Sequence, residues 1–360
     1  MAIWNGSVIN SNDTAFVFNK LANRKAVPMV RRKNGFLYAI LGKEEVGSTP
    51  GVTGFQRLKS ITGNKVEVRL LGAVASPTTV ADANQTDAVD YANAGTNGML
   101  SNGAWGAAEF PIAHYQWPFL ITDSELQRYK GDELKTVAFM DEYFDRVMLS
   151  YEKVWGTQLS MANIADTTNM ADSSRTVLGS WVYAIAGSQN LSGASTDWAN
   201  GGTYGTINRA DSGNADFRGN VYTNQGDLTL GKILTAKNAC IVNGGDPSVA
   251  IAGTTLYTKI EGLVSSYTQV AYADDWNKFG GAHTMYSGIR FVLDNYCAST
   301  VVGLLDPTTW QFYSNMTDFT TTGIIPDPSR RATYVLQTSP WVQNICLAPN
   351  KNAILGGLTS

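Results

Sequence analysis

Histidine is the side chain that most often transfers protons near neutral pH or binds zinc, and the chain contains only two, His114 and His283. Neither belongs to an HExxH pair or follows a cysteine at zinc-site spacing. His114 alternates in phase with Phe110 and Ile112, so we expect it to pack on the apolar face of a strand. His283 follows two glycines and an alanine and is expected in a turn. The sequence thus predicts no catalytic and no metal-binding residue.

A run from Gly226 to Lys232 reproduces the GxxxxGK part of a phosphate-binding loop. Ile233 stands where such a loop needs Ser or Thr to hold magnesium, and no apolar strand precedes the run. A loop leading into an amphipathic helix at Thr229 accounts for the same residues. A nucleotide-binding enzyme using Lys232 is therefore the lesser alternative, and we expect no cofactor.

Sequence motifs of two other enzyme classes are also absent. The sequence contains no GxSxG and no GxGxxG. Cys240, Cys297 and Cys346 are odd in number, far apart and set in apolar surroundings, so we expect reduced core cysteines rather than disulfides or metal ligands. We do not expect an enzyme.

Charge is scarce in this chain. Of 360 residues only 16% are charged, 44% are apolar, and the net charge is −3. Such a composition excludes a disordered chain and a protein that binds nucleic acid through a general basic field. Permanent interfaces are depleted in charged residues, so this surface is typical of a subunit covered by partners. No secretory signal or membrane-spanning stretch is recognisable, so no membrane partner is expected.

The first 45 residues differ from the rest because they carry a net charge of +4. We interpret residues 1–64 as an arm and its lead-in. The arm is either a solvated polar segment or an extension that lies against acidic partners or nucleic acid, with Arg31 and Arg32 as its candidate contact residues.

Two alternating runs predict strands at about 65–71 and 109–121, which could pair. Pro111 and Pro118 place the second strand at an edge or interrupt it. Residues 76–105 between them are rich in Ala, Asn, Gly and Thr and carry three acidic residues without a base. We expect a long projecting hairpin whose tip contacts a neighbour through Asp82, Asp87, Asp90 and Trp105.

Apolar residues at helical spacing predict a long helix over about 132–162. Its opposite face carries charged residues, among them Glu142, Arg146 and Glu152, and is expected to be solvated or to form an interface. Further on, a Gly-, Ser- and Asn-rich stretch covers 187–226. Helices are expected at 229–242 and 255–267, and strands at 288–293, 332–337 and about 341–347. This mixture without regular βαβ spacing indicates an α+β chain.

The order of these elements resembles the major capsid protein of tailed bacteriophages, which has the Hong Kong 97 type fold. The most specific part is Gly202-Thr-Tyr-Gly-Thr-Ile-Asn-Arg-Ala210 followed by Phe217-Arg-Gly-Asn220, which is similar to the family's TVGGI-R and W-R-N signature. The strand Gly288–Asp294 also resembles the family's G-x-x-V-x-x-D strand.

The resemblance implies five parts. These are the arm and lead-in (1–64), an extended loop forming a long β-hairpin (65–120), a peripheral domain with the spine helix (121–228), an axial α+β domain (229–325) and C-terminal return strands of the peripheral domain (326–360).

The function that the resemblance implies is self-assembly through hexamers and pentamers into an icosahedral shell around double-stranded DNA, which the inner face contacts non-specifically. Expected partners are a separate scaffolding protein, the portal protein and, as a possibility, a decoration protein. The expected location is the virion capsid, assembled in the bacterial host cytoplasm. Another virion structural protein, such as a tube or surface subunit, stays open as an alternative.

The candidates for inter-subunit contacts are Arg31 and Arg32 of the arm, Asp82, Asp87, Asp90 and Trp105 of the hairpin, Glu142 and Arg146 of the long helix, and Arg209 and Arg218 of the signature. Some family members cross-link a loop lysine to a neighbour's asparagine. Here Lys65 with Asn350 or Asn352 would be the matching residues, an outcome we regard as the lesser one.

Overall fold

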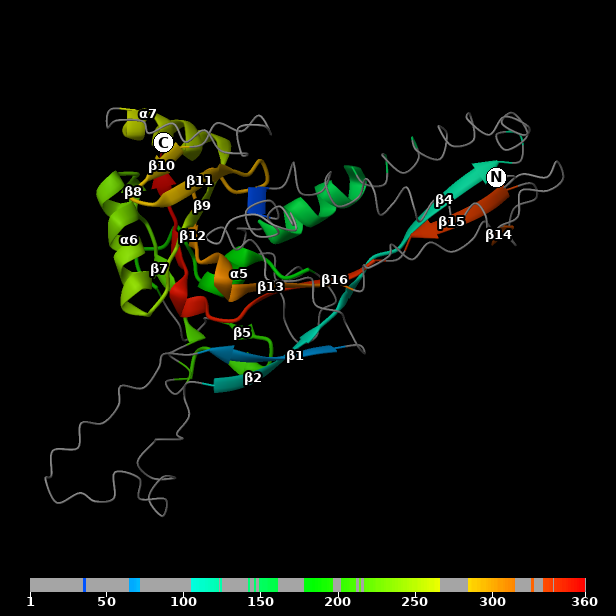
Figure 1. The fold of residues 1–360 in the computed structure, drawn as a ribbon, viewed down its shortest axis with the longest axis horizontal. Helices are drawn as coiled ribbons and strands as arrows, with labels where there is room; N and C mark the ends of the chain where they lie inside the picture. Colours follow the sequence, from blue (N-terminus) through cyan, green and yellow to red (C-terminus); the bar gives the residue numbers. More distant parts are fainter. Residues whose placement is uncertain are drawn as a thin grey trace, which may run out of the picture.

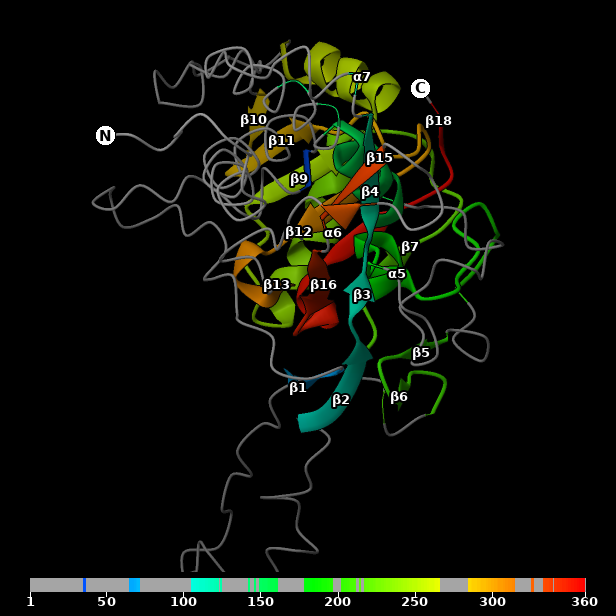
Figure 2. The same ribbon diagram turned by 90° about the vertical axis from the view of Figure 1, so that its right-hand side faces the viewer.

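The computed structural model describes residues 35–36, 65–71, 105–122, 124, 142, 146, 149–160, 178–196, 202–211, 214, 217–265, 284–314, 325–326, 333–338 and 340–359. Figure 1 shows a body of helices and sheets on one side and a thin strand pair that projects from it. In Figure 2 the pair formed by β1 and β2 lies at the lower end of the body.

The predicted pairing of two hairpin strands is confirmed, but the second strand spans Trp105–Pro111 rather than the expected 109–121. β1 (Lys65–Leu71) pairs antiparallel with β2 (Trp105–Pro111) over seven residue pairs, from Lys65 opposite Pro111 to Leu71 opposite Trp105. The expected interruption is also present, because the chain continues as β3 (Ala113–His114) and β4 (Trp117–Thr122). The first break follows Pro111, whereas Pro118 lies within β4, which is an edge strand of its sheet.

His114 does not pack as predicted. Ile112 and Ala113 are both buried, so the alternation changes phase after Ile112 and His114 is exposed. Its ring lies against that of Trp341, with centroids 4.7 Å apart. The break between β2 and β3 thus places the histidine on the opposite face, against Trp341 of β16.

A six-stranded sheet forms the centre of the body, in the order β10 (Thr284–Tyr286), β11 (Ile289–Leu293), β9 (Val249–Ala252), β12 (Val302–Leu305), β17 (Ala353–Leu355) and β7 (Asn220–Tyr222). All residues of β9, β12 and β17 are buried. Strands covered on both faces read as continuous apolar runs. β7 and β17 come from outside residues 229–325, and the five domain boundaries themselves stay a prediction.

One face of this sheet is covered by α6 (Leu230–Val242) and α7 (Thr254–Ser265), whose buried residues share a cluster with Ala250, Phe291, Val302 and Leu355. Both helices were predicted to within about two residues. Thr229 caps α6, because its hydroxyl accepts a hydrogen bond from the Lys232 amide.

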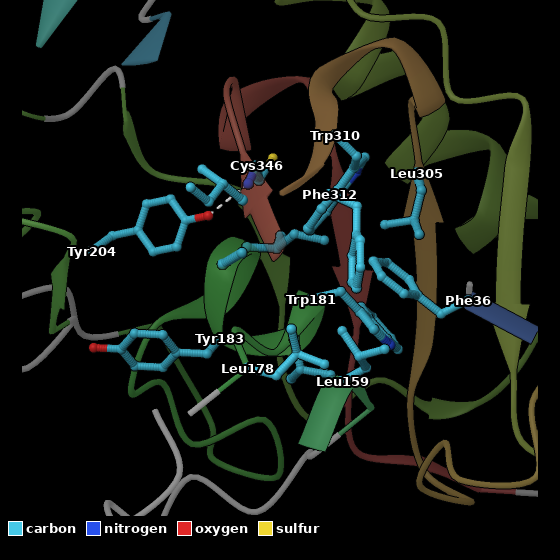
Figure 3. Close-up of a cluster of buried hydrophobic side chains, with 14 of the residues drawn as sticks. Phe36, Leu159, Leu178, Trp181, Tyr183, Tyr204, Leu305, Trp310, Phe312 and Cys346 are labelled. Carbon is cyan, nitrogen blue, oxygen red and sulfur yellow. Dashed lines mark hydrogen bonds between the residues drawn. The ribbon is translucent and has the colours of Figure 1, made fainter. Parts of the chain in front are cut away.

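The opposite face packs on a larger cluster built around Trp181, Trp310 and Phe36 (Figure 3). Trp181 begins α5 (Trp181–Ala186), in which every residue is buried. The same cluster takes Tyr151, Trp155 and Leu159 from the spine helix. Residues 142, 146 and 149–159 of that helix are helical, and the rest of the expected span 132–162 lies outside the described residues. Glu152 was expected on the solvated face, but it is only 7% exposed and accepts a hydrogen bond from the Tyr296 hydroxyl.

The remaining strands extend the body. β13 (Trp310–Ser314), β16 (Trp341–Cys346) and β3 form one sheet, and β14 (Ile325–Pro326), β15 (Thr333–Thr338) and β4 form the projecting one (Figure 1). Two further pairs join β5 (Thr203–Tyr204) to β6 (Ile207–Asn208) and β8 (Gly226–Asp227) to β18 (Leu358–Thr359). Short 3₁₀ turns lie at Pro307–Thr309 and Pro349–Lys351. The predicted C-terminal strands correspond to β15 and β16.

Gly303 lies in the middle of β12, and a Cβ atom there would come within 2.3 Å of the Trp181 ring. Gly303→Ala should therefore lower the free energy of unfolding by about 2 kcal/mol through overpacking. Gly262→Ala in α7 is the matched control, because nothing lies within 4 Å of its Cβ position. Alanine should stabilise that helix by up to about 1 kcal/mol. Urea unfolding of both variants checks the prediction, and equal midpoints for the two would contradict it.

Candidate functional site

The base of the β1–β2 pair docks on residues 203–211, which we call the hairpin seat. The Phe110 ring meets the Tyr204 ring edge-on at 4.9 Å, and the Glu109 amide lies 3.4 Å from the Thr206 hydroxyl. Gly205 has a φ of +60°, and a Cβ atom there would lie 2.9 Å from both Ala108 and Phe110. Only glycine allows the strand to approach the seat this closely.

Arg209 holds the seat from inside. Its side chain is fully buried, and its guanidinium donates to the carbonyl oxygens of Ala184 at 2.7 Å and Tyr183 at 3.0 Å. The guanidinium carbon lies 5.4 Å and 5.1 Å from the ring centroids of Tyr183 and Tyr204. Burial lowers the pKa of Arg209, and the neighbouring tyrosines oppose that shift. The two rings and two carbonyls replace the water that the charge has lost.

Further bonds join the seat to the body. The Tyr204 hydroxyl accepts from the Cys346 amide of β16 at 2.7 Å, as Figure 3 shows, and the Tyr183 hydroxyl donates to the Thr203 carbonyl at 2.8 Å. Arg218 donates to the carbonyl oxygens of Arg209 at 2.7 Å and Ala210 at 2.9 Å. The direction in which β1 and β2 leave the body is thereby fixed by bonds within one subunit.

These contacts correct one part of the predicted interface. Arg209 has no exposed surface in the subunit and bonds to α5, so it is not an inter-subunit contact. Arg218 is half-buried, and the bonds described for its guanidinium go to the seat of the same chain. The signature that identified both arginines therefore marks an internal support. The groups that hold Arg209 are the Tyr183 ring and the carbonyl oxygens of α5. They lie outside the motif in sequence, so the motif could not reveal them.

The other predicted contact residues are placed as follows. Glu142 and Arg146 are exposed and form an i, i+4 ion pair at 2.7 Å, so they offer surface to a neighbour. Trp105 begins β2 opposite Leu71. The remaining candidates, Arg31, Arg32, Asp82, Asp87 and Asp90, lie outside the described residues.

The asparagines considered for cross-linking are internal. Asn352 is fully buried, where its amide nitrogen donates to Thr309 at 3.0 Å and Ala348 at 2.9 Å and its oxygen accepts from Trp310 at 3.1 Å. Asn350 is only 4% exposed. Lys65 forms an exposed ion pair with Glu109 at 2.7 Å. A covalent bond from a neighbour's lysine to Asn352 would require the subunit to open. The folded subunit therefore cannot form the Lys65–Asn352 cross-link.

Lys232 does not project from a phosphate-binding loop. Its ammonium donates to the carbonyl oxygens of Gln225 and Asp227, at 2.7 Å for the latter. The alternative of a nucleotide site at this lysine therefore loses its central residue.

The cysteine thiols lie in the core. The three cysteines are unpaired and buried, as predicted, and burial raises the pKa of Cys240 and of Cys346 to about 12. Within the described residues no three His, Cys, Asp or Glu side chains gather as metal ligands, and no helix there has the length and apolarity to span a membrane.

A second buried junction surrounds Asp294 at the end of β11. Its carboxylate accepts from the Ser160 hydroxyl at 2.7 Å and the Tyr296 amide at 2.9 Å. Ser160 also accepts from the Trp181 indole at 3.2 Å. Burial raises the pKa of Asp294, while these hydrogen bonds partly oppose the rise. The junction thus ties the end of the spine helix to the six-stranded sheet and α5.

Comparison with known proteins identifies the family in which this fold occurs. Residues 162–324 match the family model described as SU10 major capsid protein. The solved structure titled "Cyanophage A-1(L) capsid asymmetric unit" is similar with a TM-score of 0.53 and 15% identity, covering 84% of this chain and 91% of that one. The chain is a tailed-phage major capsid protein. Its fold is of the Hong Kong 97 type, as the resemblance of the sequence implied.

Two further capsids resemble this capsid protein more weakly. The satellite phage P4 procapsid has a TM-score of 0.46 and 12% identity, covering 92% of this chain and 98% of that one. The capsid of the native GTA particle has a TM-score of 0.46 and 10% identity, with coverages of 89% and 96%. The sequence matched no curated protein.

Arg209→Met should destabilise the capsid protein. Methionine keeps much of the packed volume but leaves the Tyr183 and Ala184 carbonyls without their donors, at a cost of about 3 kcal/mol. Arg146→Met, which removes an exposed ion pair, should cost about 0.5 kcal/mol or less. Denaturant unfolding measures both. A loss at position 209 no larger than that at position 146 would show that the seat does not depend on the guanidinium.

Asp294 should make stability depend on pH. Because its pKa in the folded protein is raised above the ordinary value of 3.8, the folded state binds this proton more tightly than the unfolded chain. Its contribution is present below about pH 4 and is lost as the pH rises through the raised pKa. From pH 4 to pH 8 the free energy of unfolding should therefore fall in wild type relative to Asp294→Asn. Glu142→Gln, on the exposed helix face, is the control, and parallel pH curves for wild type and Asp294→Asn would disprove the effect.

Proposed function

We propose that this capsid protein assembles through hexamers and pentamers into an icosahedral shell that encloses double-stranded DNA. The observation that carries the proposal is the fixed base of the hairpin. Leu71 and Trp105 pair directly, so residues 72–104 leave and return at one point of the subunit. A segment held in this way is suited to contact a neighbour rather than to close on its own body.

The seat gives this contact its direction. Val66, Val68, Ala108 and Phe110 bury the inner face of the strand pair against the body. Residues 72–104 carry Asp82, Asp87 and Asp90 and no base. We assign these carboxylates to a contact with basic residues of an adjacent subunit, for which Arg31 and Arg32 of the arm are the first candidates. Their attraction would fix the register of the contact more than its strength.

Closed rings need heterologous contacts, in which one patch of a subunit meets a different patch of the next. The exposed spine-helix pair of Glu142 and Arg146 and the first residue of β2, Trp105, are proposed as parts of such contacts. The low share of charged residues, 16%, supports a subunit with much of its surface covered.

The remaining partners follow from the same proposal. Packaged DNA would touch the inner face without sequence preference, and the net charge of −3 would keep this attraction weak. A separate scaffolding protein would guide assembly in the host cytoplasm, a portal protein would occupy one vertex, and a decoration protein is an optional outer partner.

Replacing residues 76–101 with a short Gly-Ser linker tests the hairpin while leaving β1 and β2 intact. The subunit should keep its melting temperature within about 2 °C, because the described core contacts remain, but stable shells should be lost. Co-expression with the candidate scaffolding protein, followed by sedimentation and negative-stain imaging, measures this.

A charge-only variant, Asp82→Asn with Asp87→Asn and Asp90→Asn, separates the carboxylates from the length of the loop. It should assemble more slowly and with weaker dependence on salt than wild type. If the variant with a linker in place of residues 76–101 forms normal shells, the proposed contact of the hairpin with a neighbouring subunit is wrong.

A further inference from the structure

The outer stripe of α6 carries no charge. Residues at helical spacing on this side, which we call the α6 stripe, are Gly231, Leu234, Thr235, Asn238, Ile241 and Val242. The side chains of Ile241 and Val242 are 48% and 85% exposed. A helix that faces water normally places charged residues on this side.

The two lysines of α6 bond instead to loops of their own subunit. Lys232 donates to Gln225 and Asp227, and Lys237 donates to the Ser287 carbonyl. Both lie beside the stripe, where their ammonium groups cap carbonyl oxygens. The stripe therefore consists only of apolar and uncharged polar residues, and the centre of a protein interface is likewise poor in charge.

A second uncharged surface follows β11. Leu293 is 41% exposed, and Asn295, Ser299 and Thr300 are exposed in the connection to β12, which we call the β11–β12 loop. The acidic residue of this connection, Asp294, is buried in its own hydrogen bonds. Residues 295–305 contain no charged side chain.

The register of the sheet places the C-terminal end of the α6 stripe, Ile241 and Val242, and the β11–β12 loop at opposite ends of the sheet. Asn243 caps the C-terminal end of α6, and its side-chain amide donates to the side-chain oxygen of Asn220, the first residue of β7. Asn220 pairs with Ala353, at the end of the sheet where β9 begins. Leu293 pairs with Ala252, at the end where β9 finishes. Figure 1 shows the C-terminal end of α6 and the end of β11 on opposite sides of the sheet.

We propose that the α6 stripe of one capsid protein packs against the β11–β12 loop of the neighbouring copy in the same ring. This inference rests on the proposed assembly into rings. The occupant is a second copy because the C-terminal end of the stripe and the loop both lack charge and lie at opposite ends of one sheet, as a repeating head-to-tail contact requires. A charged or strongly basic partner would leave its own charges unpaired against either surface.

Single charges placed in the contact test it. Val242→Lys and Ser299→Glu should each lower the yield of shells or rings by about tenfold or more, since each buries an unpaired charge. The double variant should recover most of that loss, because the two new charges would face each other across the interface. Thr258→Lys, on the exposed side of α7, adds the same charge outside both surfaces and should assemble like wild type.

Circular dichroism and the melting temperature of the unassembled subunits show whether each variant folds. Wild-type assembly by Val242→Lys, or a double variant no better than either single variant, overturns this contact while leaving the proposed function intact. Failure of the wild-type protein itself to form rings or shells with its scaffolding partner would instead refute the proposed function.

Discussion

Burying a guanidinium is costly unless its lost water is replaced by fixed acceptors, and the hairpin seat is built around that requirement. Arg209 is positioned only if the carbonyls of Tyr183 and Ala184 and the rings of Tyr183 and Tyr204 are all in place. Satisfying this one charge therefore sets the relation of α5 to the seat. Tyr204 then fixes the seat against both β16 and Phe110 of β2. Where the hairpin leaves the body depends on a charge that is fully buried within the subunit.

The six-stranded sheet is the rigid element to which these parts attach. Its two faces belong to two clusters, one with α6 and α7 and one with α5 and the spine helix. Gly303 lets the Trp181 ring lie directly on β12, so the second cluster reaches the sheet without a gap. Asn352 satisfies the backbone at one end of the sheet, and Asp294 does so at the other. A core packed and hydrogen-bonded in this way deforms little.

Local patterns in the sequence predicted part of this architecture. The alternation around Val66 and Val68 and the cap at Thr229 are local signals, and both elements were found where expected. α5 was missed because its six residues are all buried and show no helical periodicity, and β17 was missed because three residues are too few to show alternation. His114, Glu152 and Arg209 were misplaced for a different reason. The environment of each is set by residues distant in sequence, so neither pattern nor motif could show which way the side chain turns.

The place of β17 in the sheet bears on how the subunit is made. Residues 353–355 lie between β12 and β7, which precede them by about 50 and 130 residues. Until that segment leaves the ribosome, β7 has no neighbour in the sheet and the backbone edges of β7 and β12 stay unpaired. The nascent chain therefore cannot complete its central sheet during translation, and closure depends on contacts of high sequence separation. A chain that stops before this strand therefore lacks the pairing that joins β7 to the central sheet.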